Sequence, residues 1–456
     1  MAKKYSKKFW IIFWSISVIF LTGWCFFWQI RNTTNFGLIN SVIDFLPIDE
    51  LKKAKFKTMS SFAEYLFQKD GKEKTFMLLF QNNMELRPGG GYIGSFGILK
   101  MKDGQILELQ THDLSNFDGR IPDDVLPPYP IKETLRVSSW KLRDSNWSPD
   151  FLENAKKAEE FYKMGQGQEN FDGIIAINSN VLTSFLKVTG PIEIEGFPGT
   201  YDSEDAVLTL EHQVEQGYIN QGIKEGERKS VMNLLAKEIQ NKVFSMSISQ
   251  KIKLAEVILD DLNRKDIQLY FKDVELENQA KKAEWDGSVR KNWTSDYLMM
   301  VDANMGAWKS DYYMRRSFVY TVDLSGDMPK ASLKITYQHT AKEKDWMTKD
   351  YLTYLRVYTP KGSWLTDSKD LGEKKFGEDL EKKFVGTLVG VPLGQTKTIE
   401  FYYTLPQNAV ENYDLLIQRQ SGSGDVKGEI IIIYKSQNKT TYQVDLNKDW
   451  ILSENQ

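Results

Sequence analysis

The chain opens with an unbroken apolar stretch that follows a cluster of lysines. No charged residue occurs from Phe9 to Ile30, and the residues before it include Lys3, Lys4, Lys7 and Lys8. At a rise of 1.5 Å per residue, a helix of this length crosses a bilayer core of roughly 30 Å. The exit at Ile30-Arg31 lacks the small residues of a signal-peptidase site, and bulky Trp24 precedes Cys25. The pattern therefore favours an uncleaved anchor at residues 9–30 over a cleaved signal peptide.

The distribution of charge around this stretch predicts its orientation. Lysines lie on its N-terminal side, whereas Arg31 is followed by Asp44, Asp49 and Glu50 on the other side. By the positive-inside rule, residues 1–8 form a cytoplasmic stub and everything after Ile30 lies outside. We therefore expect a single-pass protein of the cell membrane with extracytoplasmic domains.

Helix and strand patterns alternate between residues 72 and 300, after a helical linker at 31–71 in which Pro47 breaks the periodicity. The predicted strands lie at 75–80, 92–102, 105–112, 171–177, 192–194 and 267–271. Asp103-Gly104 is a strong two-residue hairpin signal between the second and third of them. Helices are predicted at 150–164, 179–188, 203–220, 227–245 and 249–263. This alternation indicates a layered α/β (α+β) domain.

The pattern changes after Trp308, where segments rich in Tyr, Val, Ile and Thr follow one another with turn residues between them. These strand-like segments are 312–324, 331–340, 351–359, 383–391, 397–405, 413–419, 427–435 and 440–446. Seven or eight short strands at such spacing predict an all-β, sandwich-like domain over residues 308–456.

Composition excludes several classes of protein. A net charge of −3 with 27% charged residues leaves no excess of positive charge for binding nucleic acid. Cys25 is the single cysteine and lies in the predicted anchor, so the outer part has no disulfide and no thiolate metal site. Three dispersed histidines argue against zinc, and no haem, nucleotide or flavin motif is evident. The outer part also lacks the G-x-S-x-G elbow of a serine hydrolase.

The densest polar segment runs from Gln81 to Gly91 and contains Arg87 followed by Pro88, Gly89 and Gly90. Glycines permit close approach of backbone N–H groups to a ligand, and an arginine beside them can hold a phosphate or carboxylate. The alternative is a wide turn in which Arg87 is a surface ion-pair partner. The segment lacks the lysine and helix start of a P-loop, so the residues alone favour the turn.

Four further charged residues are candidates for chemistry. Asp113 ends the predicted hairpin, and Arg143-Asp144 begin a polar run that leads into the helix at 150–164. Arg228 begins the helix at 227–245, where the helix dipole favours an acid unless the arginine faces an anion. A solvated arginine is the alternative for Arg228.

Three segments together resemble a bacterial family of membrane-anchored proteins labelled as a domain of unknown function, with an Arg-Pro-Gly-Gly signature. They are Asn82–Gly97 around Arg87-Pro88-Gly89-Gly90, Leu142–Phe151 around Arg143-Asp144, and Asp172–Ile177 with Thr189-Gly190-Pro191 downstream. The resemblance extends from about residue 40 to the β-rich region, and it implies no activity.

The order of elements is more distantly similar to LytR-CpsA-Psr phosphotransferases, which move glycopolymers from lipid pyrophosphate carriers to the cell wall. This similarity implies that Arg87 and Arg228, with Gly89, Gly90 and Arg143, would bind the pyrophosphate of a polyprenyl-linked glycan. Asp113 and Asp144 would be catalytic and would hold Mg²⁺. In this sequence His112 precedes Asp113 where that family has an arginine.

Two functions therefore remain open. The first is binding of a pyrophosphate-linked lipid or glycopolymer and its transfer to the cell wall. The second is a non-catalytic surface protein that binds glycans or partner proteins in envelope assembly or adhesion. Aromatic residues such as Trp346, Tyr351, Tyr354 and Trp364 could stack on sugars, although strand aromatics more often fill a core.

Overall fold

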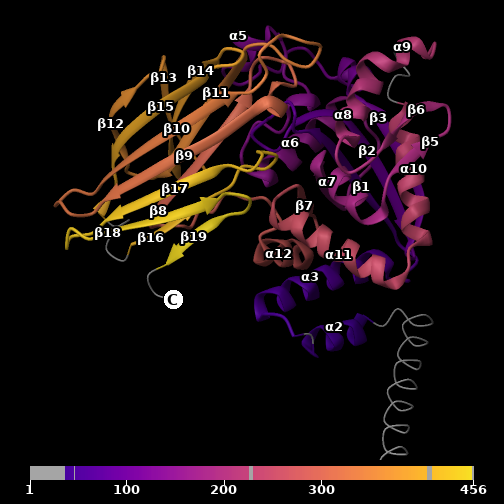
Figure 1. The fold of residues 1–456 in the computed structure, drawn as a ribbon. Helices are drawn as coiled ribbons and strands as arrows, with labels where there is room; N and C mark the ends of the chain where they lie inside the picture. Colours follow the sequence, from indigo (N-terminus) through magenta and orange to yellow (C-terminus); the bar gives the residue numbers. More distant parts are fainter. Residues whose placement is uncertain (1–35, 46, 225–229, 408–412, 454–456) are drawn as a thin grey trace, which may run out of the picture. The chain divides into compact units, whose positions relative to one another are not determined.

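The computed structural model describes residues 36–45, 47–224, 230–407 and 413–453 (Figure 1). These residues form two compact units. In the described part of the chain, the first unit comprises residues up to 74 together with 101–107, and the second comprises 75–100 and everything from 108 onward. No helix in the described ranges is long and apolar enough to cross a membrane. The expected anchor at residues 9–30 lies outside them.

The first unit contains helices α2 (Phe36–Phe45) and α3 (Glu50–Phe67). Asp49 caps α3 by accepting a hydrogen bond from the backbone N–H of Lys52 at 2.8 Å. The predicted helix break at Pro47 therefore falls between two helices, as expected. The tip of the hairpin belongs to the same unit, where Asp103 Oδ1 accepts from the backbone N–H of Gly71.

The α/β region is built on a five-stranded sheet in the order β3-β2-β1-β4-β7. Its strands are β1 (Glu73–Asn82), β2 (Tyr92–Lys102), β3 (Gln105–Asp113), β4 (Gly173–Asn178) and β7 (Ile267–Phe271). Strand β4 runs parallel to β1 and antiparallel to β7. The predicted hairpin around Asp103-Gly104 is confirmed, and both residues have the positive φ angles that such a turn requires.

Helices cover this sheet and form a side cluster. One face is packed by α6 (Phe151–Met164), whose Ala155, Ala158 and Phe161 join Met77 and Leu79 of β1 in one core. The other elements of the region are α4 (Leu114–Phe117), α5 (Ile131–Leu135), α7 (Asn180–Thr189), β5 (Ile192–Ile194), β6 (Phe197–Tyr201), α8 (Ala206–His212), α9 (Tyr218–Asn220), α10 (Ser230–Ser245), α11 (Ile248–Asn263) and α12 (Val274–Ala283).

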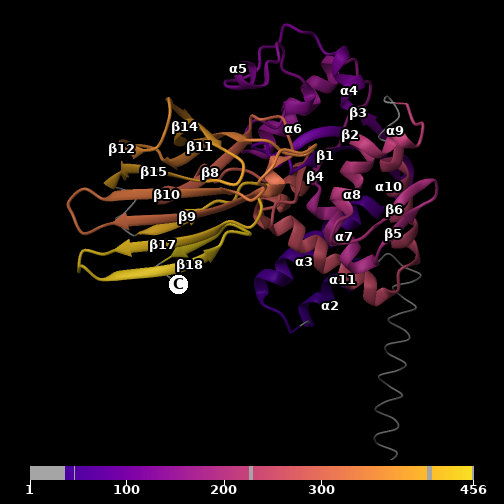
Figure 2. The ribbon, with the colours of Figure 1, turned by 45° about the horizontal axis from the view of Figure 1, so that its top comes forward.

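The β-rich region consists of two six-stranded sheets, ordered β12-β15-β10-β9-β17-β18 and β13-β14-β11-β8-β16-β19. Their strands are β8 (Asp296–Asn304), β9 (Met314–Asp323), β10 (Lys330–His339), β11 (Tyr351–Pro360), β12 (Trp364–Lys369), β13 (Lys374–Asp379), β14 (Lys382–Val391), β15 (Thr396–Thr404), β16 (Asp414–Ile417), β17 (Lys427–Ile433), β18 (Lys439–Asp445) and β19 (Trp450–Ser453). In Figures 1 and 2 these strands lie together, apart from α7 and α11.

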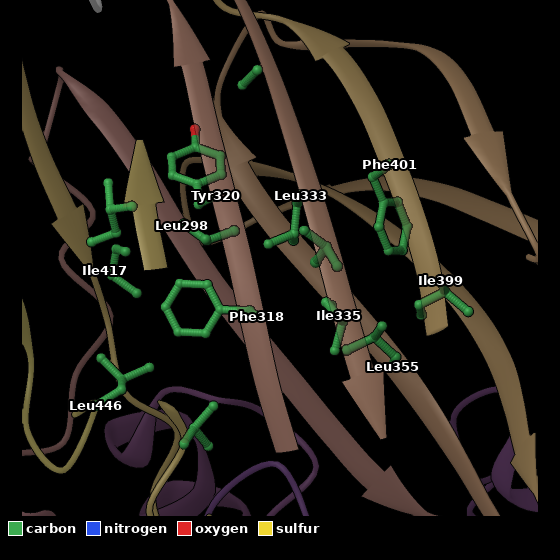
Figure 3. Close-up of a cluster of buried hydrophobic side chains, with 14 of the residues drawn as sticks. Leu298, Phe318, Tyr320, Leu333, Ile335, Leu355, Ile399, Phe401, Ile417 and Leu446 are labelled. Atoms are coloured by element: carbon green, nitrogen blue, oxygen red, sulfur yellow. The ribbon is translucent and has the colours of Figure 1, made fainter. Parts of the chain in front are cut away.

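The two sheets share one hydrophobic core. Side chains from both contribute to it, as Figure 3 shows for Phe318 and Leu333 of one sheet and Leu298 and Leu355 of the other. Alternate residues of β9 and β10 point into this core while their neighbours are partly exposed, which is the period-2 pattern of a strand with one buried face. The expectation of an α/β domain followed by a β-sandwich is therefore confirmed.

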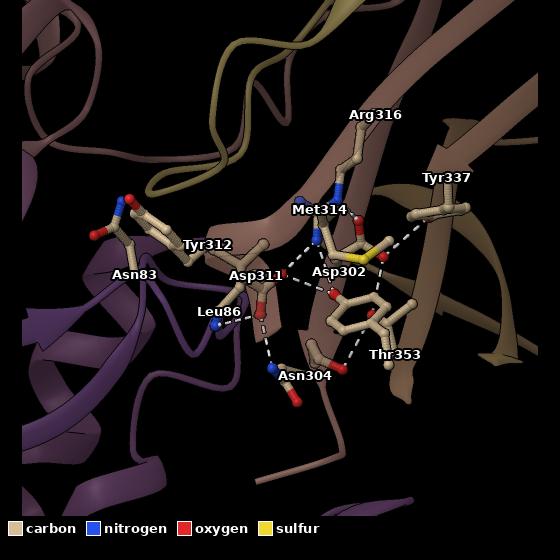
Figure 4. A network of polar contacts seen from close by, with 12 residues as sticks. Asn83, Leu86, Asp302, Asn304, Asp311, Tyr312, Met314, Arg316, Tyr337 and Thr353 are labelled. Atoms are coloured by element: carbon tan, nitrogen blue, oxygen red, sulfur yellow. Dashed lines mark hydrogen bonds and ion pairs between the residues drawn. The ribbon is translucent and has the colours of Figure 1, made fainter. Parts of the chain in front are cut away.

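A buried polar network joins the α/β region to the sheets (Figure 4). Arg316 of β9 donates from Nε to Asp302 Oδ2 at 2.9 Å and also pairs with Asp311. Asp311 accepts from the backbone N–H of Leu86 at 3.0 Å, on the segment that follows β1. This network fixes the end of β1 against β8 and β9.

Several elements differ from the sequence prediction. Strand β8 belongs to the second sheet, although the α/β domain was expected to extend to residue 300. Its residues are buried almost without interruption, so its sequence has no alternation that marks a strand. Strands β12 and β13 were missed because most of their residues are polar and exposed. Helix α12 was also missed.

Candidate functional site

The Arg87 segment is buried, and its guanidinium is engaged by other groups of the chain. Arg87 is 2% exposed, and its Nε donates to Asp144 Oδ1 at 2.9 Å. Nη2 donates to Glu85 at 2.9 Å, and Nη1 donates to the carbonyl oxygen of Asn304 at 3.0 Å. This one side chain therefore links the end of β1 to β8 and to the segment before α6.

Charge and burial compete in this cluster. Burial raises the pKa of Glu85, and the neighbouring Arg87 counteracts that effect. Burial also works to lower the pKa of Arg87, but the charges of Glu85 and Asp144 outweigh it and raise that pKa. A cation held by two carboxylates in a buried site is stabilised in its charged form and has little capacity left for an external anion.

The glycines after Arg87 pack against other parts of the chain. The N–H of Gly89 donates to the carbonyl of Asn146 at 3.0 Å, and its own carbonyl accepts from Gln268. Gly90 has φ of +133°, and a Cβ built there would lie 2.1 Å from Gln81 Oε1. A side chain at Gly90 would clash with Gln81, so glycine is required at that position. Gly89 and Gly90 are both buried where they pack against other segments of the chain.

The other predicted site residues that the structure describes, Arg143 and Asp113, form contacts with different partners from those of Arg87. Arg143 pairs through Nε with Asp118 at 2.5 Å, and Asp113 caps α4 by accepting from the N–H of Ser115 at 2.9 Å. Burial raises the pKa of Asp118, and Arg143 opposes this shift. Arg87 and Asp144 are brought together, whereas Arg228 lies outside the described residues.

The described residues contain no group of three or more His, Cys, Asp or Glu side chains that could hold a metal ion. Asp144 is engaged by a guanidinium and Asp113 by a backbone amide. The Mg²⁺ site expected at Asp113 and Asp144 stays a prediction, and we derive no metal-dependent step from it.

An open cleft lies beside this cluster and has a volume of about 520 Å³. Its lining residues come from the segment before α6, from α6 itself, from the segment between α12 and β8, from β11 and from the end of β13 with the turn that follows it: Trp140, Ser145, Trp147, Ser148, Glu153, Asn154, Lys157, Lys291, Arg356, Asp379, Leu380 and Glu381. This volume falls within the usual range of small-molecule sites.

Local hydrogen bonds position the two indoles of the cleft. The Nε1–H of Trp140 donates to the carbonyl of Asp144 at 2.8 Å. Asn154 of α6 bonds the backbone of Ser148 through both its amide nitrogen and its amide oxygen, which holds the Trp147-Ser148 segment against the helix. The Trp147 ring stacks on Tyr354, and the Arg356 guanidinium lies 5.1 Å from its centroid.

Two buried polar groups of the cleft find no hydrogen-bond partner among the described residues: Ser145 Oγ and Arg356 Nε. Ser145 is 2% exposed and Arg356 is 5% exposed. A buried polar atom without a partner costs about 1–3 kcal/mol, and both of these atoms belong to residues that line the cleft.

The sequence indicated a candidate site in the polar run from Arg143 to Asp150, which contains Trp147, but it did not predict the cleft. Trp140 lies outside that run, and Arg356 is more than two hundred positions away in β11. No local pattern connects them, because the cleft exists only where the α/β region meets the second sheet.

Residues 71–214 match the family model described as Protein of unknown function (DUF4012). The expected resemblance to a domain of unknown function is thus confirmed over these residues. They include seven of the twelve residues that line the cleft. No curated protein matches the chain.

Solved structures show only weak likeness. The protein gbs0355 from Streptococcus agalactiae is 14% identical over 48% of this chain and 75% of that one, with a TM-score of 0.30. Lin1025 from Listeria innocua is 14% identical over 47% and 79%, with a TM-score of 0.26. An M1 zinc metallopeptidase from Deinococcus radiodurans is 11% identical over 31% and 42%, with a TM-score of 0.19. At these TM-scores the likeness supports no inference about this chain.

Proposed function

We propose that this chain is a non-catalytic cell-envelope protein that binds a neutral saccharide chain in the cleft beside α6. The observation that carries the proposal is the pairing of two partly buried indoles with two buried polar groups that lack partners in the described structure. The apolar stretch from Phe9 to Ile30 would hold the protein at the membrane.

The indoles suit the apolar faces of sugar rings. Trp140 and Trp147 are both partly exposed and both line the cleft. Aromatic rings provide a large, rigid contact surface at low cost in conformational entropy. Lys157 lies 5.1 Å from the centroid of the Trp140 ring and pairs with Glu160 at 2.6 Å. Contacts of this kind hold the two indoles in place, and the parts of them that remain exposed line the cleft.

The polar groups suit sugar hydroxyls. A hydroxyl both donates and accepts, so one ligand group can bond the Oγ of Ser145 while another accepts from the Nε of Arg356. Because these atoms are already buried and without partners in the described structure, the bonds formed on binding would not first require the loss of bonds within it.

The balance of charge favours a neutral ligand. Three acidic residues (Glu153, Asp379 and Glu381) and three basic residues (Lys157, Lys291 and Arg356) line the cleft. Lys291 lies 3.6 Å from Asp150, which further reduces the positive field. A pyrophosphate would instead require an excess of positive charge from unpaired arginines.

Transfer of a lipid-linked glycopolymer, which the similarity to LytR-CpsA-Psr enzymes implies, remains a prediction. Its proposed clamp depends on Arg87, and four hydrogen bonds within the chain occupy that guanidinium. Of the two functions, saccharide binding is therefore the one that the described geometry supports better.

The test is calorimetric titration of the full-length protein with the tetrasaccharides chitotetraose and maltotetraose, and with geranyl pyrophosphate. A Trp147→Leu variant is compared with Trp450→Leu, which removes a partly exposed indole of β19 outside the cleft. We expect at least one tetrasaccharide to bind, with a loss of about tenfold or more in Trp147→Leu alone.

Three results would overturn the proposal. The first is an absence of tetrasaccharide binding by folded protein, and the second is equal weakening of that binding in both variants. The third is binding of geranyl pyrophosphate alone in a manner that requires Arg87, which would favour the transfer function instead.

A further inference from the structure

A second pocket, of about 300 Å³, lies inside the β-sandwich and is separate from the saccharide cleft. Its lining residues come from β11, β13 and β14 of one sheet and from β12 and β15 of the other, with the loop before β12: Val357, Thr359, Ser363, Trp364, Leu365, Phe376, Lys383, Val385, Phe401 and Tyr403. Strands β12 and β13 are the edges of their sheets, so the pocket lies between the sheets at one side of the sandwich.

The pocket is a gap in an otherwise continuous core. Val357, Val385 and Phe401 belong to the cluster that fills the sandwich, and Figure 3 shows Phe401 among those side chains. Two large aromatics of the lining, Trp364 and Phe376, are 66% and 58% exposed. Exposed aromatics that adjoin an apolar pocket mark a surface that gains stability when an apolar ligand covers it.

Two polar groups accompany this apolar lining. Ser363 is 2% exposed, and its Oγ has no hydrogen-bond partner in the part of the chain that the structure describes. The ammonium of Lys383 lies 4.5 Å from the centroid of the Trp364 ring. A hydroxyl donor and a cation beside the apolar side chains of this pocket fit a ligand with one anionic end.

Addition of a peptide strand to these edges is disfavoured. The pairing of β12 with β15 contains a bulge between Leu365 and Asp367, which disrupts the regular edge. Strand β13 carries Lys374, Lys375 and Glu378, all exposed. Bulges and charges are the devices that protect sheet edges from further strands. The apolar space lies between the sheets. A thin, flexible hydrocarbon chain fits there better than a peptide strand, which would need a row of backbone hydrogen bonds along the edge of a sheet.

We propose that this pocket binds the hydrocarbon chain of a single-chain amphiphile whose head group carries a carboxylate or phosphate. The chain would lie among Val357, Val385 and Phe401, continuing the core of the sandwich. The head group would accept hydrogen bonds from Ser363 Oγ and from the Lys383 ammonium. This site is independent of the saccharide cleft.

The experiment measures displacement of the fluorescent probe 11-(dansylamino)undecanoic acid from the full-length protein. The competitors are dodecanoate, dodecanoyl lysophosphatidylglycerol and dodecanol, which share a chain length and differ in head group. Val385→Phe fills the pocket, Lys383→Gln removes its cation, and Tyr442→Phe is a control on β18, outside the pocket. Thermal unfolding of each variant verifies folding.

We expect the probe to bind the wild type and Tyr442→Phe equally, and to bind Val385→Phe at least tenfold more weakly. Lys383→Gln should weaken the binding of dodecanoate severalfold and leave the binding of dodecanol unchanged. The more potent of dodecanoate and the lysophospholipid identifies the source of the chain as free fatty acid or membrane lipid. Probe binding that persists in folded Val385→Phe, or competition by none of the three amphiphiles, would overturn the proposal.

Discussion

Gly422 packs so closely on Gly90 that a Cβ built on Gly422 would lie 1.7 Å from the carbonyl oxygen of Gly90. Gly422 follows β16 in the sandwich, and Gly90 precedes β2 in the α/β region. Neighbouring bonds reinforce this contact, since the Asn83 amide donates to the carbonyl of Gly422 at 3.3 Å and Gln268 donates to Ser421 Oγ at 3.1 Å. The glycine-rich segment after Arg87 therefore joins two parts of the fold.

Substitution of Gly422 should destabilise the protein strongly. Its φ is +72°, so Gly422→Ala combines an unfavourable backbone conformation with a clash against backbone atoms that cannot rotate away. We expect a loss of about 2–4 kcal/mol in the free energy of unfolding, measured by urea denaturation. Gly424→Ala is the matched control, because Gly424 is exposed and a Cβ built on it meets nothing within 4 Å. Equal losses in both variants would contradict the packing argument.

Removal of the Arg87 guanidinium should cost more stability than removal of a surface charge. Arg87→Met leaves the carboxylates of Glu85 and Asp144 buried without their cation. Breaking a buried pair in this way costs about 3–5 kcal/mol. The control is Lys427→Met, which breaks an exposed pair with Asp445 and should cost less than about 1 kcal/mol. An Arg87→Met protein as stable as the control would contradict the stabilising role assigned to this buried pair.

The sequence was sufficient to predict elements whose burial is periodic or bounded by strong turn signals. Asp103-Gly104 predicted the hairpin, and the alternation in β9 and β10 predicted two strands of the sandwich. Strand β8 escaped detection because it is buried on both faces and therefore has no period of two. Strands β12 and β13 escaped because edge strands with charged residues resemble loops.

The candidate site was predictable only in part, for a physical reason. Arg87 and Asp144 were both selected from sequence, and they do form a pair. The polarity of a residue does not reveal whether its partner is a ligand or another part of the chain. The cleft depends on the contact of Arg356 with Trp147, which are brought together by tertiary structure alone. Single-sequence patterns carry no signal for such pairs.

Asp296 should make stability fall as the pH rises between about 4 and 6. It is fully buried, and burial raises its pKa to about 6, although the hydroxyls of Tyr320 and Tyr413 donate to it and work in the opposite direction. The unfolded chain has a pKa of roughly 3.9 at this residue, so the folded state binds more protons across this interval. Ionisation should therefore remove on the order of 2–3 kcal/mol of stability.

The measurement is the free energy of unfolding between pH 4 and 8 for the wild type, Asp296→Asn and the exposed-residue control Asp367→Asn. Asp261, whose pKa burial raises to about 7, contributes to the slope of all three proteins in the same way. The difference between the wild type and Asp296→Asn should thus isolate Asp296, with the variant gaining relative stability as the pH rises. A difference that does not change with pH would contradict this assignment.

Arg356→Lys should weaken saccharide binding in a protein that still folds. Arg356 donates to the carbonyl of Trp147 at 2.7 Å, covers the Trp147 ring and has an Nε–H without a partner in the described structure. Lysine keeps the charge but lacks the planar fork, so a bond to the ligand is lost. One hydrogen bond to a charged donor is worth about 1.5–3 kcal/mol, which corresponds to a loss of about tenfold or more in affinity. Calorimetry with the tetrasaccharide bound by the wild type measures this loss, and Arg315→Lys, on an exposed arginine of β9, serves as the control. Unchanged affinity together with reduced thermal stability would assign Arg356 to the support of Trp147 alone.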